Sequence, residues 1–241
     1  MKALANAIRK HKTLLFFDLE ATQTSHELIE IGAYRVTIRD DFSIKKIFKP
    51  YHAYCKPKHR IGHVISKLTG ITEKIIADKG ISYREVLNGL QKYLGKEYKD
   101  VLLICYGDQD PRIFQSSMEN NLDANRDVSR YLSHHCFNFS AFLSQYVRDE
   151  NNNVMSLSRM VEHLGLKFEG TAHGALADAK NLLNLYVTFL EHPELIVQDY
   201  KLRLTRNPDV PMTMRRVAAM LNEGKTVTPE EYDKIVEETI L

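Results

Sequence analysis

The first half of the chain alternates between apolar runs of strand length and segments with helical spacing. Thr13–Leu19 is a short apolar run rich in aromatic side chains, which predicts a strand buried on both faces. Leu28–Ile38 and Phe42–Cys55 are rich in β-branched residues and roughly alternate between apolar and polar positions, so we expect two strands joined as a hairpin. Val101–Cys105 repeats the buried-strand pattern, and Tyr131–Phe139 is the fifth predicted strand.

Helical spacing predicts four helices around these strands. In Ile81–Leu94 the apolar residues fall on one helical face, and Gly95 follows, a residue typical of helix ends. Pro111 suits the first turn of a second helix. Ser156–Gly165 and His173–Leu190 complete the set. Strands that alternate with helices predict an α/β fold, here a mixed five-stranded sheet flanked by helices.

The composition changes near His192. Residues 191–241 carry 7 Lys and Arg against 10 Asp and Glu, a charge of −3, whereas the remainder carries 26 against 21, a charge of +5. Two short segments of this tail have helical spacing, Thr213–Asn222 and Pro229–Glu238. We therefore expect one domain over residues 1–192 and a small helical C-terminal appendage over residues 193–241.

Composition narrows the class of protein. The chain has 241 residues, 44% of them hydrophobic and 27% charged, with a net charge of +2. It can therefore bury a core, and no overall field drives it onto nucleic acid or a membrane. Three cysteines without a Cys-x-x-Cys pair argue against a disulfide framework and a structural zinc site. No apolar run approaches the roughly 20 residues of a membrane span, so we expect a soluble, cytoplasmic protein.

Two carboxylates close the first predicted strand. Asp18 and Glu20 are two residues apart, so both side chains project from the same face of a strand. Neighbouring carboxylates repel each other, and a divalent cation would remove that conflict. The alternative is that the strand end simply turns outward into solvent.

Further acidic residues follow later elements. Asp110 comes just after the Val101–Cys105 strand and just before a helix, with Asp108 as a rival two residues earlier. Either could instead be a helix cap. Asp178 lies five residues after His173, a little over one helical turn, so the two are neighbours if His173 stands at the helix start. A surface or capping role for His173 is the alternative.

Together these residues indicate a particular chemistry. Four carboxylates at element ends can hold two Mg²⁺ ions about 4 Å apart, which stabilise the attacking and leaving oxygens of an in-line displacement at phosphorus. Hard cations prefer oxygen ligands, and the absence of clustered Cys or His argues against zinc.

The motifs resemble those of the DEDD superfamily of 3′–5′ exonucleases, in its histidine-containing (DEDDh) branch. Phe17–Thr22 resembles the first motif, Glu27–Ala33 the second strand, and Leu68–Thr72 the turn that follows. His173–Ala179 contains the H-x4-D signature. Tyr106–Asp110 resembles the W-G-D-x-D form of enhanced-RNAi-type and KapD-like members, with tyrosine in place of tryptophan, and that alignment makes Asp110 the ligand.

The resemblance implies a ribonuclease H-like fold and hydrolysis of nucleotides from a free 3′ end, with release of 5′-mononucleotides. It implies that two Mg²⁺ or Mn²⁺ ions are held by four carboxylates, with a histidine as general base and four residues lining the terminal-nucleotide pocket. The implied catalytic residues are Asp18, Glu20, Asp110, His173 and Asp178, and the pocket residues are Ala21, Thr22, Leu68 and Ile71.

The substrate is expected to be single-stranded nucleic acid. The basic run Lys56–Arg60 can contact phosphates without reading sequence, and the form of the middle motif favours RNA. One alternative is a DNA exonuclease for repair or proofreading. Another is a catalytically silent binding module, although such a module has no chemical reason to keep the full set of acidic residues. The resemblance also allows a homodimer.

Overall fold

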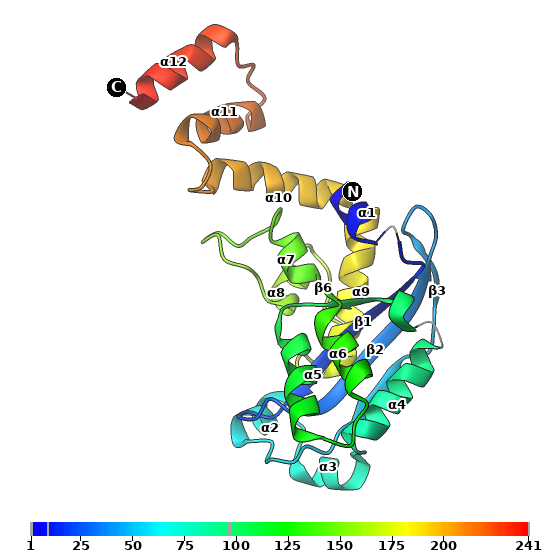
Figure 1. Cartoon of the computed structure of the whole chain (residues 1–241). Coiled ribbons are helices and arrows are strands. Elements are labelled where there is room, and N and C mark those ends of the chain that lie inside the picture. Colours follow the sequence, from blue (N-terminus) through cyan, green and yellow to red (C-terminus); the bar gives the residue numbers. More distant parts are fainter. Residues whose placement is uncertain (1, 9, 96–97, 241) are drawn as a thin grey trace.

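The computed structural model describes residues 2–8, 10–95 and 98–240, and within them a six-stranded mixed sheet forms the centre of the molecule (Figure 1). Met1 and Leu241, the outer limits of the two predicted domains, lie outside the described residues. The strands are β1 (Thr13–Ala21), β2 (Leu28–Ile38), β3 (Ile44–Ile47), β4 (Tyr51–Tyr54), β5 (Leu102–Cys105) and β6 (Cys136–Asn138).

The strand order is β3-β2-β1-β5-β6, and β4 also pairs with β2. β1 runs antiparallel to β2 and parallel to β5, and β6 runs parallel to β5. The mixed sheet of the α/β prediction is confirmed, but with six strands instead of five. The segment Phe42–Cys55 forms two strands because Pro50, which has no N–H to donate, stands between β3 and β4.

The helices are α1 (Lys2–Ile8), α2 (His63–Thr69), α3 (Glu73–Lys79), α4 (Tyr83–Leu94), α5 (Gln109–Asn120), α6 (Arg126–His134), α7 (Phe139–Leu143), α8 (Leu157–His163), α9 (Ala175–Glu191), α10 (Pro193–Arg206), α11 (Met212–Asn222) and α12 (Pro229–Ile240). A short 3₁₀ turn, Tyr98–Asp100, precedes β5. The four helices predicted around the strands are present as α4, α5, α8 and α9.

The predicted strand Tyr131–Phe139 is wrong over most of its length. Helix α6 ends at His134, and only Cys136–Asn138 is a strand. Asn125 caps the helix through its side-chain oxygen, which accepts the Val128 N–H at 3.2 Å. Val128 and Leu132 are four residues apart and both buried, which is a helical spacing. This spacing starts at Val128, before the predicted strand begins at Tyr131.

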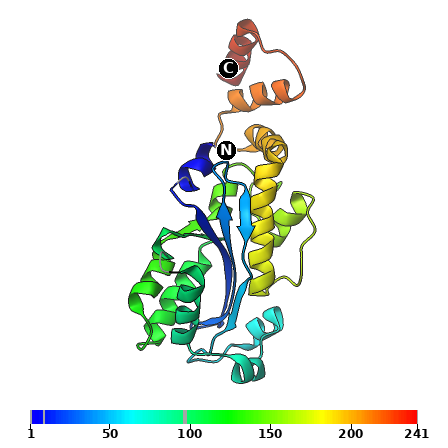
Figure 2. The ribbon, with the colours of Figure 1, turned by 90° about the vertical axis from the view of Figure 1, so that its right-hand side faces the viewer.

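Both faces of the sheet are covered, as Figure 2 shows with α9 on one side and α4–α6 on the other. Along β1, Leu14 and Phe16 enter a core that contains Tyr186 of α9. Leu15 and Phe17 enter a second core with residues of α4–α6. The strand is therefore buried on both faces, and its alternation decides which side chains face α9.

The C-terminal segment holds three helices, one more than the sequence predicted. The missed helix is α10, which begins at Pro193 and buries Ile196 in the core shared with α9. Helices α11 and α12 lie beyond it and project from the rest of the molecule (Figures 1 and 2). The division at residues 192 and 193 stays a prediction. No described helix has the length and apolar character needed to cross a membrane.

Candidate active site

Asp18 and Glu20 lie at the end of β1 on the face that α9 covers. They continue the alternation of Leu14 and Phe16, whose side chains pack in the α9 core, whereas Leu19 belongs to the opposite core. In the antiparallel register with β2, Asp18 stands opposite Gly32 and Glu20 opposite Glu30. The strand period therefore places both carboxylates beside the start of α9.

Gly32 allows α9 to come this close. A Cβ at this position would lie 2.2 Å from the backbone nitrogen of Leu176, in the first turn of α9. Any larger residue would push the helix away from β2. The first turn of α9 therefore packs directly on the backbone opposite Asp18.

His173 and Asp178 enter the site from the start of α9. Asp178 lies in the first turn, and its Oδ2 accepts the His173 backbone N–H at 3.2 Å. His173 has a positive φ of 64° and an exposed side chain. One side-chain atom from each of Glu20, His173 and Asp178 lies within 4.8 Å of the others, close enough to share one metal ion.

Asp110 approaches from the other side, at the start of α5. It is buried, and its Oδ1 accepts the Leu19 backbone N–H at 2.9 Å, so it lies against the end of β1. Asp108 points elsewhere, because its exposed carboxylate pairs with Arg112 at 2.6 Å. Of the two candidates from the middle motif, the structure brings only Asp110 to the other carboxylates.

Burial and repulsion from neighbouring carboxylates raise the pKa of all four side chains. For Asp18, burial is the largest cause, followed by repulsion from Asp110, Asp178 and Glu20. Burial also raises the pKa of Glu20 to about 8, of Asp110 to about 7 and of Asp178 to about 6. Such a cluster favours a bound cation over four separated negative charges.

No lysine or arginine in the described part of the chain pairs with the cluster. Within the described residues, no ion pair involves Asp18, Glu20, Asp110 or Asp178. Carboxylate oxygens are the donors that Mg²⁺ and Mn²⁺ prefer. The residues present therefore fit a site for hard divalent cations.

Glu30 is a fifth carboxylate that the sequence analysis missed. It is 5% exposed, and its Oε2 accepts the Ala175 backbone N–H at 3.0 Å, at the start of α9. Its Oε1 lies 2.6 Å from Nε2 of His52 on β4. The signal was present, because Glu30 is the one acidic residue in the apolar, buried first half of β2.

The four predicted pocket residues differ in exposure. Leu68 of α2 is 48% exposed and Ala21 is half-buried. Thr22 is buried, and Ile71 is 3% exposed in a small core with Ile29, Ile61 and Ile76. Of the four, Leu68 and Ala21 are therefore the two whose side chains are accessible from the surface.

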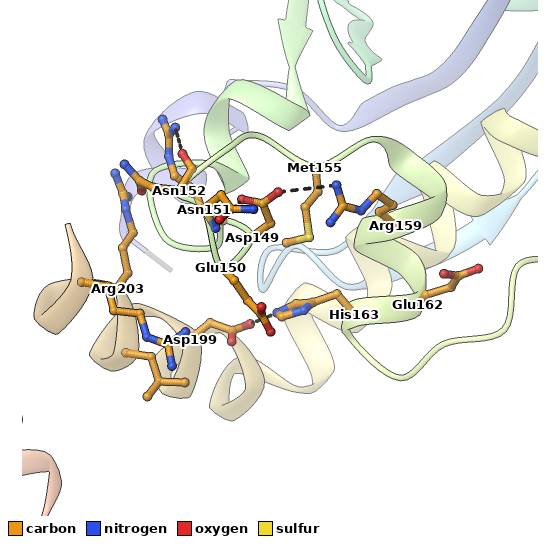
Figure 3. Close-up of a pocket in the computed structure, with 13 residues that line it drawn as sticks. Asp149, Glu150, Asn151, Asn152, Met155, Arg159, Glu162, His163, Asp199 and Arg203 are labelled. Carbon is orange, nitrogen blue, oxygen red and sulfur yellow. Dashed lines mark hydrogen bonds and ion pairs between the residues drawn. The ribbon is translucent and has the colours of Figure 1, made fainter. Parts of the chain in front are cut away.

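A separate cavity lies at the α10 end of the molecule. It has a volume of about 620 Å³, between residues 148–155, α8 and α10. Figure 3 shows two ion pairs across it, from Arg159 to Asp149 at 3.5 Å and from His163 to Asp199 at 2.9 Å. Its lining includes none of the predicted site residues, so it is distinct from the carboxylate cluster.

The sequence matches a known family over most of its length. The model of the family RNase_T, described as exonuclease, matches residues 15–186, which include all five predicted catalytic residues. The chain belongs to this exonuclease family. The predicted resemblance to exonucleases is thereby confirmed. A search of the curated proteins gives no match.

Solved structures of nucleases share the fold. The nuclease domain of 3′hExo, a DEDDh family member bound to rAMP, is 19% identical, with a TM-score of 0.60 over 75% of this chain and 92% of that one. Cell-death related nuclease 4 (CRN-4) is 20% identical, with a TM-score of 0.61 over 76% of this chain and 64% of that one.

A third similar structure is E. coli exonuclease I in complex with a 5cy-dT13 oligonucleotide, 16% identical with a TM-score of 0.58. The alignment covers 81% of this chain and 44% of that one, so this exonuclease domain corresponds to less than half of E. coli exonuclease I. At these identities the similarity establishes the ribonuclease H-like fold.

Proposed function

We propose that this exonuclease-family protein hydrolyses single-stranded nucleic acid, RNA in preference to DNA, from a free 3′ end with two divalent metal ions. The observation that carries the proposal is the convergence of Asp18, Glu20, Asp110 and Asp178. They come from β1, α5 and α9, and burial and repulsion from neighbouring carboxylates raise their pKa values.

These four carboxylates would hold two Mg²⁺ or Mn²⁺ ions. When bound, such a pair stabilises the charge on the attacking and leaving oxygens at phosphorus. Asp18 is repelled by each of the other three carboxylates, so it lies among them and would serve as one of the metal ligands. The Leu19 N–H fixes the orientation of Asp110, and the His173 N–H fixes that of Asp178.

His173 would act as the general base. Its side chain is exposed, so a water molecule can reach it, and it lies beside Glu20 and Asp178. A neutral imidazole can take the proton from that water, which then attacks the terminal phosphodiester. The hydrogen bond from the His173 backbone to Asp178 holds the base at a fixed position relative to a carboxylate of the cluster.

The terminal nucleotide would lie against Ala21 and Leu68, with Thr22 and Ile71 supporting the pocket from behind. Leu68 offers an exposed apolar surface on α2 for a base. The preference for RNA is supported by the middle motif Tyr106–Asp110, and the 3′hExo structure with its bound rAMP agrees with it.

The second candidate is a DNA exonuclease. The specific observation in its favour is the similarity to E. coli exonuclease I, which was solved with an oligothymidine. The two substrates share the phosphodiester on which the metal site acts, so the carboxylate cluster serves either one.

The test compares RNA and DNA strands of one sequence, labelled at either end, with Mn²⁺ or with EDTA. We expect metal-dependent release of 5′-mononucleotides from the 3′ end, faster with RNA, and no release by the variant Asp18→Ala. Faster digestion of DNA would select the second candidate. Absence of metal-dependent release from both strands would refute the proposal and favour a silent binding module.

A further inference from the structure

A loop of exposed cations lies between β4 and α2. In this loop Lys56, Lys58, His59 and Arg60 are all exposed. His59 pairs with Glu27, but none of the ion pairs in the described part of the chain includes Lys56, Lys58 or Arg60. Among the described residues these three cations thus have no acidic partner at ion-pair distance, although Lys56 lies close enough to Glu85 to help lower the pKa of that carboxyl.

A buried carboxylate holds this loop in place. Glu27 is 1% exposed, and its Oε1 accepts the Lys58 backbone N–H at 2.8 Å. Its Oε2 contacts the His59 N–H at 3.1 Å, the His59 ring at 2.7 Å and the Ser25 hydroxyl at 2.7 Å. Burial alone would raise the Glu27 pKa, but these hydrogen bonds bring it below its ordinary value.

Both ends of the loop are also fixed. The Lys56 N–H donates to the Ile81 carbonyl at 2.8 Å. At the other end Ile61 is fully buried, and its N–H donates to Glu73 Oε1 at 3.0 Å. The Ile61 carbonyl accepts the Gln23 N–H at 2.8 Å. The cations are therefore presented by a rigid backbone, which reduces the entropy that a bound partner would have to remove.

The loop lies next to the catalytic end of β1. Glu27 exchanges two hydrogen bonds with Thr22, at 2.8 Å and 2.9 Å, and Thr22 is only two residues beyond Glu20. Helix α2 begins three residues after the loop. In Figure 1 it lies at the same end of the sheet as the C-terminal end of β1. A strand whose 3′ end reaches the carboxylates would carry its next phosphates past these cations.

We propose that Lys56, Lys58 and Arg60 bind the phosphodiester backbone adjacent to the 3′ end, and that Glu27 positions them. This inference rests on the proposed function. A site built from carboxylates repels a polyanion, and fixed cations beside it offset that repulsion without reading sequence. The role explains why the chain buries a charged Glu27 where an uncharged residue could fill the space.

The first test measures binding of a 5′-fluorescein single-stranded 12-mer in EDTA, which stops metal-dependent hydrolysis. Lys58→Ala and Arg60→Ala should each weaken binding severalfold. Each should also reduce the slope of log K against log salt by about 0.7, the value for one phosphate contact on a single strand. Lys45→Ala is the matched control, because Lys45 is an exposed cation on β3, beside the opposite end of β2.

The second test uses the sign of a charge change. Glu27→Gln removes a negative charge, so a general electrostatic effect would tighten binding. The positioning role predicts weaker binding, because the loop loses acceptors for His59 and Ser25. Tighter or unchanged binding would overturn the role of Glu27.

The outcomes separate this inference from the proposed function. If Lys58→Ala and Arg60→Ala bind like Lys45→Ala while the wild type digests 3′ ends, the loop is not a phosphate site and the exonuclease proposal stands. If the wild type neither binds nor digests any strand, both proposals fail. The substituted lysine and arginine are exposed, so these variants should fold normally.

Discussion

Glu20 and Glu30 lie directly opposite each other on the antiparallel strands β1 and β2. Like charges in this arrangement destabilise a sheet, and Glu30 contributes to the raised pKa of Glu20. Glu30 is nevertheless fully engaged, with the Ala175 N–H on one oxygen and His52 on the other. Gly174, the residue before the helix, offers no side-chain cap, so Glu30 supplies one from the neighbouring strand.

Replacing Glu30 should therefore move the start of α9. Glu30→Ala leaves the buried Ala175 N–H without an acceptor, a cost of about 1–3 kcal/mol in the free energy of unfolding. It should also lower kcat, because His173 and Asp178 depend on that helix start. Glu30→Gln keeps an acceptor oxygen and should recover most of both. Thermal melts and kcat measured on the two variants provide the check, and equal losses in both would contradict the capping role.

The middle motif offers a matched pair of aspartates. Asp110→Asn removes a buried carboxylate from the cluster and should abolish metal-dependent hydrolysis. Asp108→Asn removes an exposed carboxylate that pairs only with Arg112, an ion pair worth little to stability, and should leave turnover near normal. Initial rates at saturating Mn²⁺ distinguish the two. Loss of activity in Asp108→Asn with retention in Asp110→Asn would reverse the assignment.

The carboxylate cluster also predicts how stability depends on pH. Unfolded Asp and Glu titrate near pH 4, whereas folded Asp178, Asp110 and Glu20 have pKa values of about 6, 7 and 8. Between these limits the folded chain binds more protons than the unfolded chain, so the free energy of unfolding falls as pH rises. The metal-free protein should therefore melt at a lower temperature at pH 8 than at pH 5.

Added Mn²⁺ should reverse this fall in melting temperature, most strongly at pH 8, because it binds the deprotonated cluster of the folded state. The measurement is a series of thermal melts in EDTA and in Mn²⁺. Asp18→Asn serves as the control, since it removes one charge from the centre of the cluster and should flatten the metal-free profile. A metal-free melting temperature that rises from pH 5 to pH 8 would contradict the raised pKa values.

Much of the site could be predicted because it follows from local periodicity. The strand period places Asp18 and Glu20 on one face, and the helix period places Asp178 near His173. The local pattern alone does not decide between Asp110 and Asp108, two residues apart, and the resemblance to known motifs is what favours Asp110. That choice depends on the Leu19 N–H, a partner 91 residues away that no local pattern reveals.

The missed features depend on packing between distant segments. Glu30 matters because Ala175 meets it across 145 residues of chain, an approach that Gly32 makes possible. Helix α10 was not predicted because its apolar pattern is weak: Ile196 is its one buried residue. The error at Tyr131–Phe139 arose because, over so short a segment, the spacing of apolar residues does not distinguish an amphipathic helix from a strand.

The exposed position of His173 leads to the last prediction. Its backbone N–H orients Asp178, and this contact survives any substitution of the side chain. His173→Ala should therefore keep the metal site largely intact while removing the proton acceptor, which lowers kcat about 10²–10⁴-fold, the usual loss for a general base. Binding of Mn²⁺, followed by calorimetry, should change little, and the rate of the variant should gain from higher pH because hydroxide replaces the missing base. If Mn²⁺ affinity falls in step with kcat, His173 is a metal ligand instead of a base. Its position within 4.8 Å of Glu20 and Asp178 allows that role.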